Sequence, residues 1–319
     1  MNMRSNRPLL TVAALTIAVL AVSSSAPLIA FAAAPALAIA FWRNALAAVA
    51  LTPITLGPRR AEFREIRSGR HRRAGLLCLL AGGALAVHFA TWMPSVQLGS
   101  VATATALVAT QPVWQGLIAA GQGRRPSAAG WLGIVLAVSG AAWATGADIG
   151  VSRQAVLADA LALIGAIAAA VYTALGERAR ADLSTTTYTW LCYGTCAVLL
   201  LIVCLAGRIP IAGYAASTWA AILAIAAGAQ LLGHSMFNYA LHRVSATTIS
   251  VIVLLEVPGA ALLAWSWLGQ QPRAASLPGL ILIVLGVVVV ILGSRAARDR
   301  ARATASLADA ADPTVPRAS

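Results

Sequence analysis

Residues 112–140 read PVWQGLIAAGQGRRPSAAGWLGIVLAVSG, and residues 258–286 read PGAALLAWSWLGQQPRAASLPGLILIVLG. The second stretch follows the first at a distance of 146 residues without a gap, and apolar residues match between the shared positions. Five of the pairs that are identical at this distance serve as anchors: His88 and His234, Pro112 and Pro258, Gly123 and Gly269, Gly133 and Gly279, and Gly140 and Gly286. Because proline and histidine are among the matches, this spacing indicates an internal repeat that organises the fold.

The composition identifies lipid as the solvent of this fold. Of 319 residues, 60 % are hydrophobic and 10 % are charged, and the mean hydropathy is +0.81. Soluble domains are about 45–50 % apolar and about 25 % charged. The composition therefore excludes a soluble protein and indicates an integral membrane protein. The four cysteines lie in apolar runs without a C-x-x-C pair, so we expect packing residues and neither a metal nor another cofactor.

Apolar runs of about 20 residues, the length of helix that crosses a bilayer, divide the chain into ten predicted spans. Each half holds five, an odd number, so the second half must enter the membrane upside down relative to the first. We expect an all-α integral membrane fold with ten transmembrane helices in two inverted five-helix repeats, residues 9–145 and 156–293. Residues 294–319 are expected to form a disordered cytoplasmic tail. The spans are 9–31, 35–56, 74–94, 101–120, 128–145, 156–176, 187–206, 218–240, 247–268 and 277–293.

The placement of arginine gives the orientation. All 23 basic residues are arginine, and the net charge is +13. With the N-terminus inside, fourteen arginines before the tail fall in inside segments, against Arg153, Arg208 and Arg273 in outside ones. This topology signal explains the charge without nucleic acid as a partner and puts both termini in the cytoplasm. The first span has features of a signal peptide, but its apolar run is long and the repeat needs it, so we expect it to remain.

Three segments resemble the drug/metabolite transporter superfamily, EamA type: residues 106–144, residues 249–293, and residues 158–180, which read ADALALIGAIAAAVYTALGERAR. The resemblance covers about residues 9–293 and implies ten helices in two inverted repeats. It also implies movement of small organic solutes across a plasma membrane of the bacterial inner-membrane type. The chain departs from the family at Arg124 and Gln270, where a Glu usually follows the glycine that ends a span.

Polar side chains inside the predicted spans are the candidates for a substrate site, because such residues are costly in lipid. Gln230, His234 and Asn238 are spaced four residues apart and therefore lie on one face of a helix. His88 and Trp92 form the matching stripe in the other half. We expect both stripes to line a central cavity. The alternative is that they form hydrogen bonds between helices.

The spans that contain the two prolines add four more candidates. These are Thr110, Gln111 and Trp114 in the first half and Glu256 in the second, where Glu256 stands at the position that matches Thr110. Pro112 and Pro258 are expected to kink their helices beside them. A carboxyl group at this depth is either the partner of a buried cation or a protonatable coupling group.

The segment FWRNALA, residues 41–47, places Arg43 about eight residues into the second span. An arginine at the centre of a span costs about 2.5–3.5 kcal/mol on insertion scales. One interpretation is an anchor that reaches the interface or binds backbone carbonyls. The other is a cation in the cavity that holds a substrate carboxylate or pairs with Glu256.

Two classes of function agree with these features. The first hypothesis is a secondary transporter, with export favoured, that moves small metabolites such as amino acids or amphiphilic compounds by alternating access. Protons would couple to transport through Glu256, His88 or His234. Its partners are the small-molecule substrate and the lipid bilayer, and a homodimer is compatible with the sequence. The alternative is a non-transporting scaffold or an intramembrane enzyme, although the chain has no G-x-S-x-G, H-E-x-x-H or P-loop motif.

Overall fold

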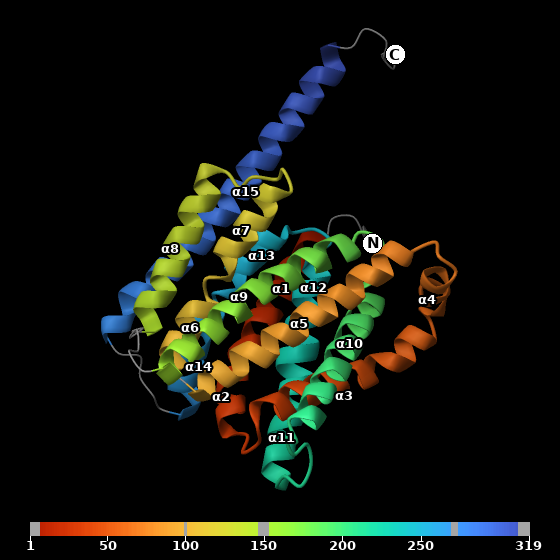
Figure 1. Cartoon of the computed structure of the whole chain (residues 1–319). Coiled ribbons are helices and arrows are strands. Elements are labelled where there is room, and N and C mark those ends of the chain that lie inside the picture. The colour runs from red at the N-terminus through yellow and green to blue at the C-terminus, as the bar shows by residue number, and fades with distance from the viewer. Residues whose placement is uncertain (1–6, 99–100, 146–152, 269–273, 312–319) are drawn as a thin grey trace.

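The computed structural model describes residues 7–98, 101–145, 153–268 and 274–311, and every regular element in these ranges is a helix (Figure 1). In the first half the helices are α1 (Arg7–Ser23), α2 (Ser25–Phe31), α3 (Ala36–Leu56), α4 (Arg60–Arg67), α5 (Arg72–Leu98), α6 (Val101–Val108), α7 (Gln111–Gly121) and α8 (Ala128–Thr145). In the second half they are α9 (Arg153–Ala179), α10 (Thr185–Ala206), α11 (Ala216–Ile225), η1 (Ala226–His234), α12 (Ser235–Ala240), α13 (Ala246–Val253), α14 (Glu256–Leu268), η2 (Ala274–Ser276) and α15 (Leu277–Ala311).

Eight segments of the described chain are long and apolar enough to cross a membrane. A shorter apolar helix covers Ala128–Ala144, and the expected span 101–120 is divided into α6 and α7. The prediction of an all-helical membrane fold is confirmed, whereas the number of ten spans is not. The division of the fourth span has a physical cause, because Pro112 starts a new helix and neither piece is then long enough to cross alone.

Both prolines of the repeat lie beside breaks in their helices, as predicted. α6 ends at Val108, and α7 has Pro112 in its first turn, where the missing N–H costs little. In the second half, α13 ends at Val253 and α14 begins two residues before Pro258. The two breaks therefore occupy equivalent places in the two repeats.

The inverted relation between the halves is visible where α8 packs against α15. A Cβ atom on Gly133 would lie 2.7 Å from the carbonyl oxygen of Gly286, and a Cβ atom on Gly140 would lie 2.6 Å from that of Gly279. In the repeat Gly133 corresponds to Gly279 and Gly140 to Gly286. Gly133 therefore meets the equivalent of Gly140, and Gly140 meets the equivalent of Gly133. Such a reciprocal contact between antiparallel helices is the pattern of a two-fold axis. The missing side chains let the two backbones approach closely.

The same exchange relates the helices at the centre of the molecule. α5 packs along α9. The equivalent of α5 in the second half is the segment from α11 to α12, and the equivalent of α9 in the first half is α1. These two equivalents also pack together, because α1 contacts η1 and α12. α3 packs against α10, the helix that occupies the same place in the second repeat. The centre of the fold is therefore built from both repeats in a symmetric way.

Residues 294–311, for which the sequence predicts disorder, belong to helix α15 in the structure. α15 continues to Ala311 and projects from the rest of the molecule (Figure 1). Residues 294–311 are rich in alanine and arginine and contain neither glycine nor proline. These residue types favour a helix even where packing does not impose one. Residues 312–319 lie outside the described part of the chain.

Candidate functional site

A cavity of about 280 Å³ lies where the two halves meet. Its wall combines side chains of α1, α3, α5 and α7 with side chains of α9, η1, α12, α13 and α14. Seven of the ten candidates line it: Arg43, His88, Trp92, Gln111, His234, Asn238 and Glu256. This volume is close to the lower end of small-molecule pockets, about 300–1,000 Å³. The arrangement can therefore enclose a small organic molecule between ionisable and aromatic groups.

Arg43 is part of this wall and is 1 % exposed. Its Nε donates a 2.7 Å hydrogen bond to Oε1 of Gln230, and its guanidinium lies 4.6 Å over the ring of Phe89. Nη1 lies 3.5 Å from Oγ of Ser25. Among the described residues, no carboxylate lies within 4.0 Å of the guanidinium, although Glu256 lines the same cavity. Of the two interpretations of Arg43, the geometry favours the cation in the cavity.

A π-helix explains how Gln230 reaches Arg43. In η1 the backbone turns are wider than in an α-helix, because each carbonyl accepts from the N–H five residues later. The carbonyl oxygen of Gln230 accepts from the backbone N–H of Ser235 and also from the hydroxyls of Ser235 and Tyr193, each at 3.4 Å. The side-chain Nε2 donates to Oδ1 of Asn44 at 3.1 Å. Gln230 therefore lies behind Arg43 and outside the cavity lining, which corrects the expectation of a single cavity-facing stripe.

Asn238 and Tyr172 join α12 to α9 at the cavity. The hydroxyl of Tyr172 donates to Oδ1 of Asn238 at 3.0 Å, and Nδ2 of Asn238 lies 2.7 Å from the phenol oxygen. Nδ2 also lies 3.4 Å from the hydroxyl of Tyr193. Both members of the pair are buried and line the cavity. The second half thus contributes a fixed polar surface to the site.

The two histidines occupy repeat-equivalent positions in the same wall. His88 Nδ1 donates a 2.9 Å hydrogen bond to the carbonyl oxygen of Gly165, and its ring stacks on Trp92 with 5.7 Å between centroids. His234 packs between the rings of Phe89 and Tyr172. In the described part of the chain, Nε1 of Trp92 is buried without a hydrogen-bond partner. An unpaired buried donor is costly, so this N–H favours a ligand that can accept from it.

The remaining candidates divide between the wall and its surroundings. Gln111 lines the cavity, and its Nε2 donates to Oγ1 of Thr173 at 3.2 Å. Thr110 and Trp114 do not line it. Trp114 Nε1 donates to Oγ1 of Thr110 at 3.2 Å, because the two residues lie one turn apart at the start of α7. The hydroxyl of Thr110 donates in turn to the carbonyl oxygen of Leu107, so both side chains are engaged beside the helix break and outside the lining of this cavity.

Tyr172, Thr173 and Phe89 are among the cavity-lining residues that sequence reasoning missed. Tyr172 and Thr173 interrupt an alanine-rich stretch of the span 156–176, so the rule that polar residues in spans mark the site would have found them. No such signal marks Phe89, an apolar residue in an apolar helix. Its role depends on the guanidinium that lies over its ring, and that contact joins two separate helices.

Comparison with known proteins agrees with this architecture. The sequence profile of the EamA-like transporter family matches residues 9–146 and again residues 156–292, once in each half. No curated protein sequence matches the chain. A solved crystal structure has a similar fold, with a TM-score of 0.74 and 19 % sequence identity over 91 % of this chain and 99 % of that chain. Because the profile covers most of the sequence as two repeats, this chain belongs to the EamA-like transporter family, whose members are drug and metabolite transporters.

Proposed function

We propose that this chain is a secondary transporter that exports small organic metabolites across the plasma membrane, with both termini in the cytoplasm. The observation that carries the proposal is the cavity between the repeats, whose wall holds a guanidinium without a carboxylate partner among the described residues. The family supports transport in general. The excess of arginine in the segments between spans supports the orientation.

The substrate we propose carries a carboxylate, as amino acids and related amphiphilic metabolites do. Gln230 and Phe89 hold the guanidinium of Arg43 in place, so it is preorganised for an anion. Glu256 lines the same cavity, and in its ionised form it would bind an ammonium group. A charged group is costly at this depth unless it is paired. The class of molecule that fits therefore has a carboxylate to pair with Arg43, an ammonium group to pair with Glu256, and an apolar remainder.

Alternating access is supported by the symmetry of the fold. In an inverted repeat, each half can adopt the conformation of the other, which exchanges the end of the molecule at which the cavity is open. The breaks between α6 and α7 and between α13 and α14 are equivalent places at which the helices can bend. The close glycine contact of α8 with α15 holds the two halves together during such a movement.

Proton coupling is proposed for His234 and Glu256. Both line the cavity, and neither side chain has a hydrogen-bond partner among the described residues. Nδ1 of His88 is bound to the backbone of α9, so this histidine is less free to exchange a proton. Exchange at His234 or Glu256 would change the charge that surrounds the substrate.

Flux into proteoliposomes tests the proposal. Purified protein is reconstituted, and uptake of a panel of labelled amino acids and amphiphilic cations is measured with and without a pH gradient. We expect flux of at least one carboxylate-bearing substrate, its loss in Arg43→Ala, and no change in Arg178→Ala, an exposed arginine at the end of α9. Absence of flux for every member of the panel would count against transport.

The direction of transport needs a separate measurement. Cells that express the protein are grown on toxic analogues of the substrates that pass the flux assay. Export predicts resistance relative to cells that express Arg43→Ala. Increased sensitivity would show import and would contradict the proposed direction.

A further inference from the structure

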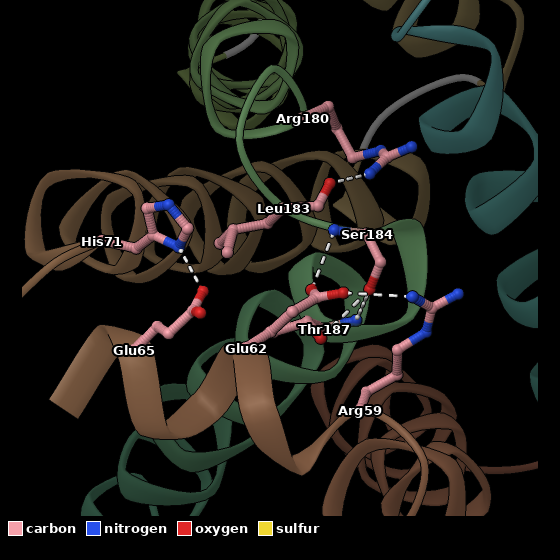
Figure 2. Close-up of polar contacts among 8 residues, drawn as sticks. All are labelled: Arg59, Glu62, Glu65, His71, Arg180, Leu183, Ser184 and Thr187. Atoms are coloured by element: carbon pink, nitrogen blue, oxygen red, sulfur yellow. Dashed lines mark hydrogen bonds and ion pairs between the residues drawn. The ribbon is translucent and has the colours of Figure 1, made fainter. Parts of the chain in front are cut away.

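Glu62 of α4 joins the first half of the chain to the start of α10 (Figure 2). Its Oε2 accepts a 3.0 Å hydrogen bond from the backbone N–H of Ser184, the residue that caps α10. Oγ of Ser184 accepts in turn from the backbone N–H of Thr187 at 3.3 Å. N–H groups at the start of a helix have no partner within it, and the helix dipole is positive there. A carboxylate from another segment therefore completes the cap of α10.

The contact with Ser184 favours the ionised form of the Glu62 carboxyl group. Burial opposes ionisation of the carboxyl group, but hydrogen bonds from Ser184 and Thr187 and the charge of Arg59 outweigh it and lower its pKa below the usual range. Nη1 of Arg59 lies 3.2 Å from Oε1 of Glu62. The carboxylate is thus ionised and engaged at both oxygens.

An aromatic contact adds to the same docking of α4 on α10. The ring of Phe63, the residue after Glu62, meets the ring of Trp190 edge to face, with 5.8 Å between centroids. Nε1 of Trp190 donates to Oγ1 of Thr52 in α3 at 2.9 Å. α4 is therefore attached to α10 by neighbouring polar and apolar groups.

Arg180, in the turn between α9 and α10, connects this place to the cavity. It is 6 % exposed, and Nη1 donates to the carbonyl oxygen of Leu183 while Nε donates to that of Asn238 at 3.1 Å. Figure 2 shows Arg180 and Leu183 directly beside the Glu62–Ser184 contact. The connection runs through Glu62, Ser184, Leu183, Arg180 and Asn238. Asn238 is the residue whose amide pairs with Tyr172 in the cavity wall.

A second carboxylate makes an equivalent contact. Oε1 of Glu177 accepts from the backbone N–H of Ala246, the first residue of α13, at 3.2 Å. Its Oε2 accepts from Nη2 of Arg124, in the connection between α7 and α8, at 2.8 Å. α10 and α13 of the second half therefore both begin at a carboxylate. The carboxylate at α10 belongs to α4 of the first half, and the carboxylate at α13 is bound by Arg124 of the first half.

We infer that the contacts of Glu62, Arg180 and Glu177 form the gate that closes the cavity at the α4 end of the molecule, and that Arg180 positions Asn238 according to the state of that gate. This inference rests on the proposed function, since a gate is needed only by a cavity that opens to both sides. The bonds are suited to opening, because water can replace each N–H and carboxylate partner when the helices part. The α8–α15 contact, in contrast, is held by close backbone packing that water cannot replace.

Thiol accessibility tests the gate without any substrate. Val253 lines the cavity at the end of α13, so Val253→Cys reports the access of a membrane-impermeant maleimide to the cavity from each face of sealed vesicles. The four native cysteines are buried, and the chain without this substitution gives the background. Two variants are then compared in the reporter chain. Glu62→Gln keeps the shape and removes the charge, and Arg180→Lys keeps the charge and loses the fork that holds two carbonyls.

We expect each variant to raise the labelling rate from the α4 face by about tenfold, the effect of one charge-assisted hydrogen bond on an equilibrium. Glu65→Gln is the matched control, because Glu65 lies on α4 but faces Arg70 and His71. We expect it to leave the rate unchanged.

Unchanged labelling in both variants, or an equal increase in Glu65→Gln, overturns the gate. Size-exclusion profiles in detergent show which variants are folded, and either gate variant decides the question if the other does not fold. If the native chain transports its substrate but the two gate variants label at the unchanged rate, the gate is contradicted and the proposed function is not. If the native chain transports nothing but the gate variants label faster as expected, the proposed function is contradicted and the gate is not.

Discussion

Arg43 and Gln230 come from opposite halves of the chain and share a 2.7 Å hydrogen bond at the back of the cavity wall. The partner is an amide, which orients the guanidinium without neutralising its charge. A carboxylate at the same place would orient it equally well but would neutralise it. The identity of residue 230 therefore decides how much positive charge reaches the cavity.

Gln230→Glu should preserve the fold and weaken binding of a carboxylate substrate. The new carboxylate would pair with Arg43, and we expect KM to rise by about tenfold or more because one interaction with the substrate is lost. Flux measurements in proteoliposomes check this, with Gln154→Glu at the exposed start of α9 as the control. An unchanged KM would show that Arg43 does not bind the substrate.

Gly140→Ala should destabilise the pair formed by α8 and α15. The added Cβ would lie 2.6 Å from the carbonyl oxygen of Gly279, and backbone cannot move aside as a flexible side chain can. We expect a loss of about 1–3 kcal/mol in the free energy of unfolding, measured by denaturant titration in micelles. Gly121→Ala, where no atom lies within 4 Å of the added Cβ, should be close to neutral. Equal effects of the two substitutions would refute the close contact.

Tyr172→Phe should loosen the polar surface that the second half contributes to the cavity. The hydroxyl both donates to and accepts from Asn238, so its removal leaves a buried amide with fewer partners. We expect a loss of about 0.5–1.5 kcal/mol in the free energy of unfolding and a higher KM. Tyr214→Phe, in the connection before α11, is the control for loss of a hydroxyl outside the cavity. If both variants transport alike, the pair has no role in binding.

The cap formed by Glu62 predicts a pH-dependent stability. Burial opposes the charge, yet hydrogen bonds from Ser184 and Thr187 hold the pKa of the carboxyl below its ordinary value of 4.5, and Arg59 and Arg180 are the charges that face it. Since the folded pKa is lower than the unfolded one, the stabilisation is fully present above 4.5 and is lost as the pH falls through the folded pKa.

Glu62→Gln should accordingly have a lower melting temperature than the native chain at neutral pH, and the difference should disappear well below pH 4.5. Thermal unfolding in detergent over this range measures the effect. Glu65→Gln should follow the native chain throughout. A difference that stays constant with pH would mean that the charge of Glu62 does not contribute to the cap.

The sequence predicts the parts of this fold that depend on periodicity. The match of Gly133 with Gly279 and of Pro112 with Pro258 indicates the inverted repeat, and the structure pairs the glycines and breaks the helices at these places. Arg43 is found by the cost of a charge in lipid. These signals are local or regular, so they can be read without the fold.

Other parts of the site depend on contacts that no periodicity encodes. The π-helix turns Gln230 behind Arg43, because the wider turns end the α-helical spacing that would align it with His234. The contact between Glu62 and Ser184 joins residues 122 positions apart. Such arrangements follow from tertiary packing, which overrides the pattern of any single span.

The reciprocal glycine contact of α8 and α15 bears on the ancestry of the molecule. Two separate five-helix chains, inserted in opposite directions, could form the same contact with each other. Fusion into one polypeptide replaces a concentration-dependent association with an intramolecular one, and it lets each half diverge. Arg43, with Thr189 at the equivalent position, and Glu256, with Thr110, show that divergence. One cation and one acid now occupy a cavity in which identical halves would have placed two of each.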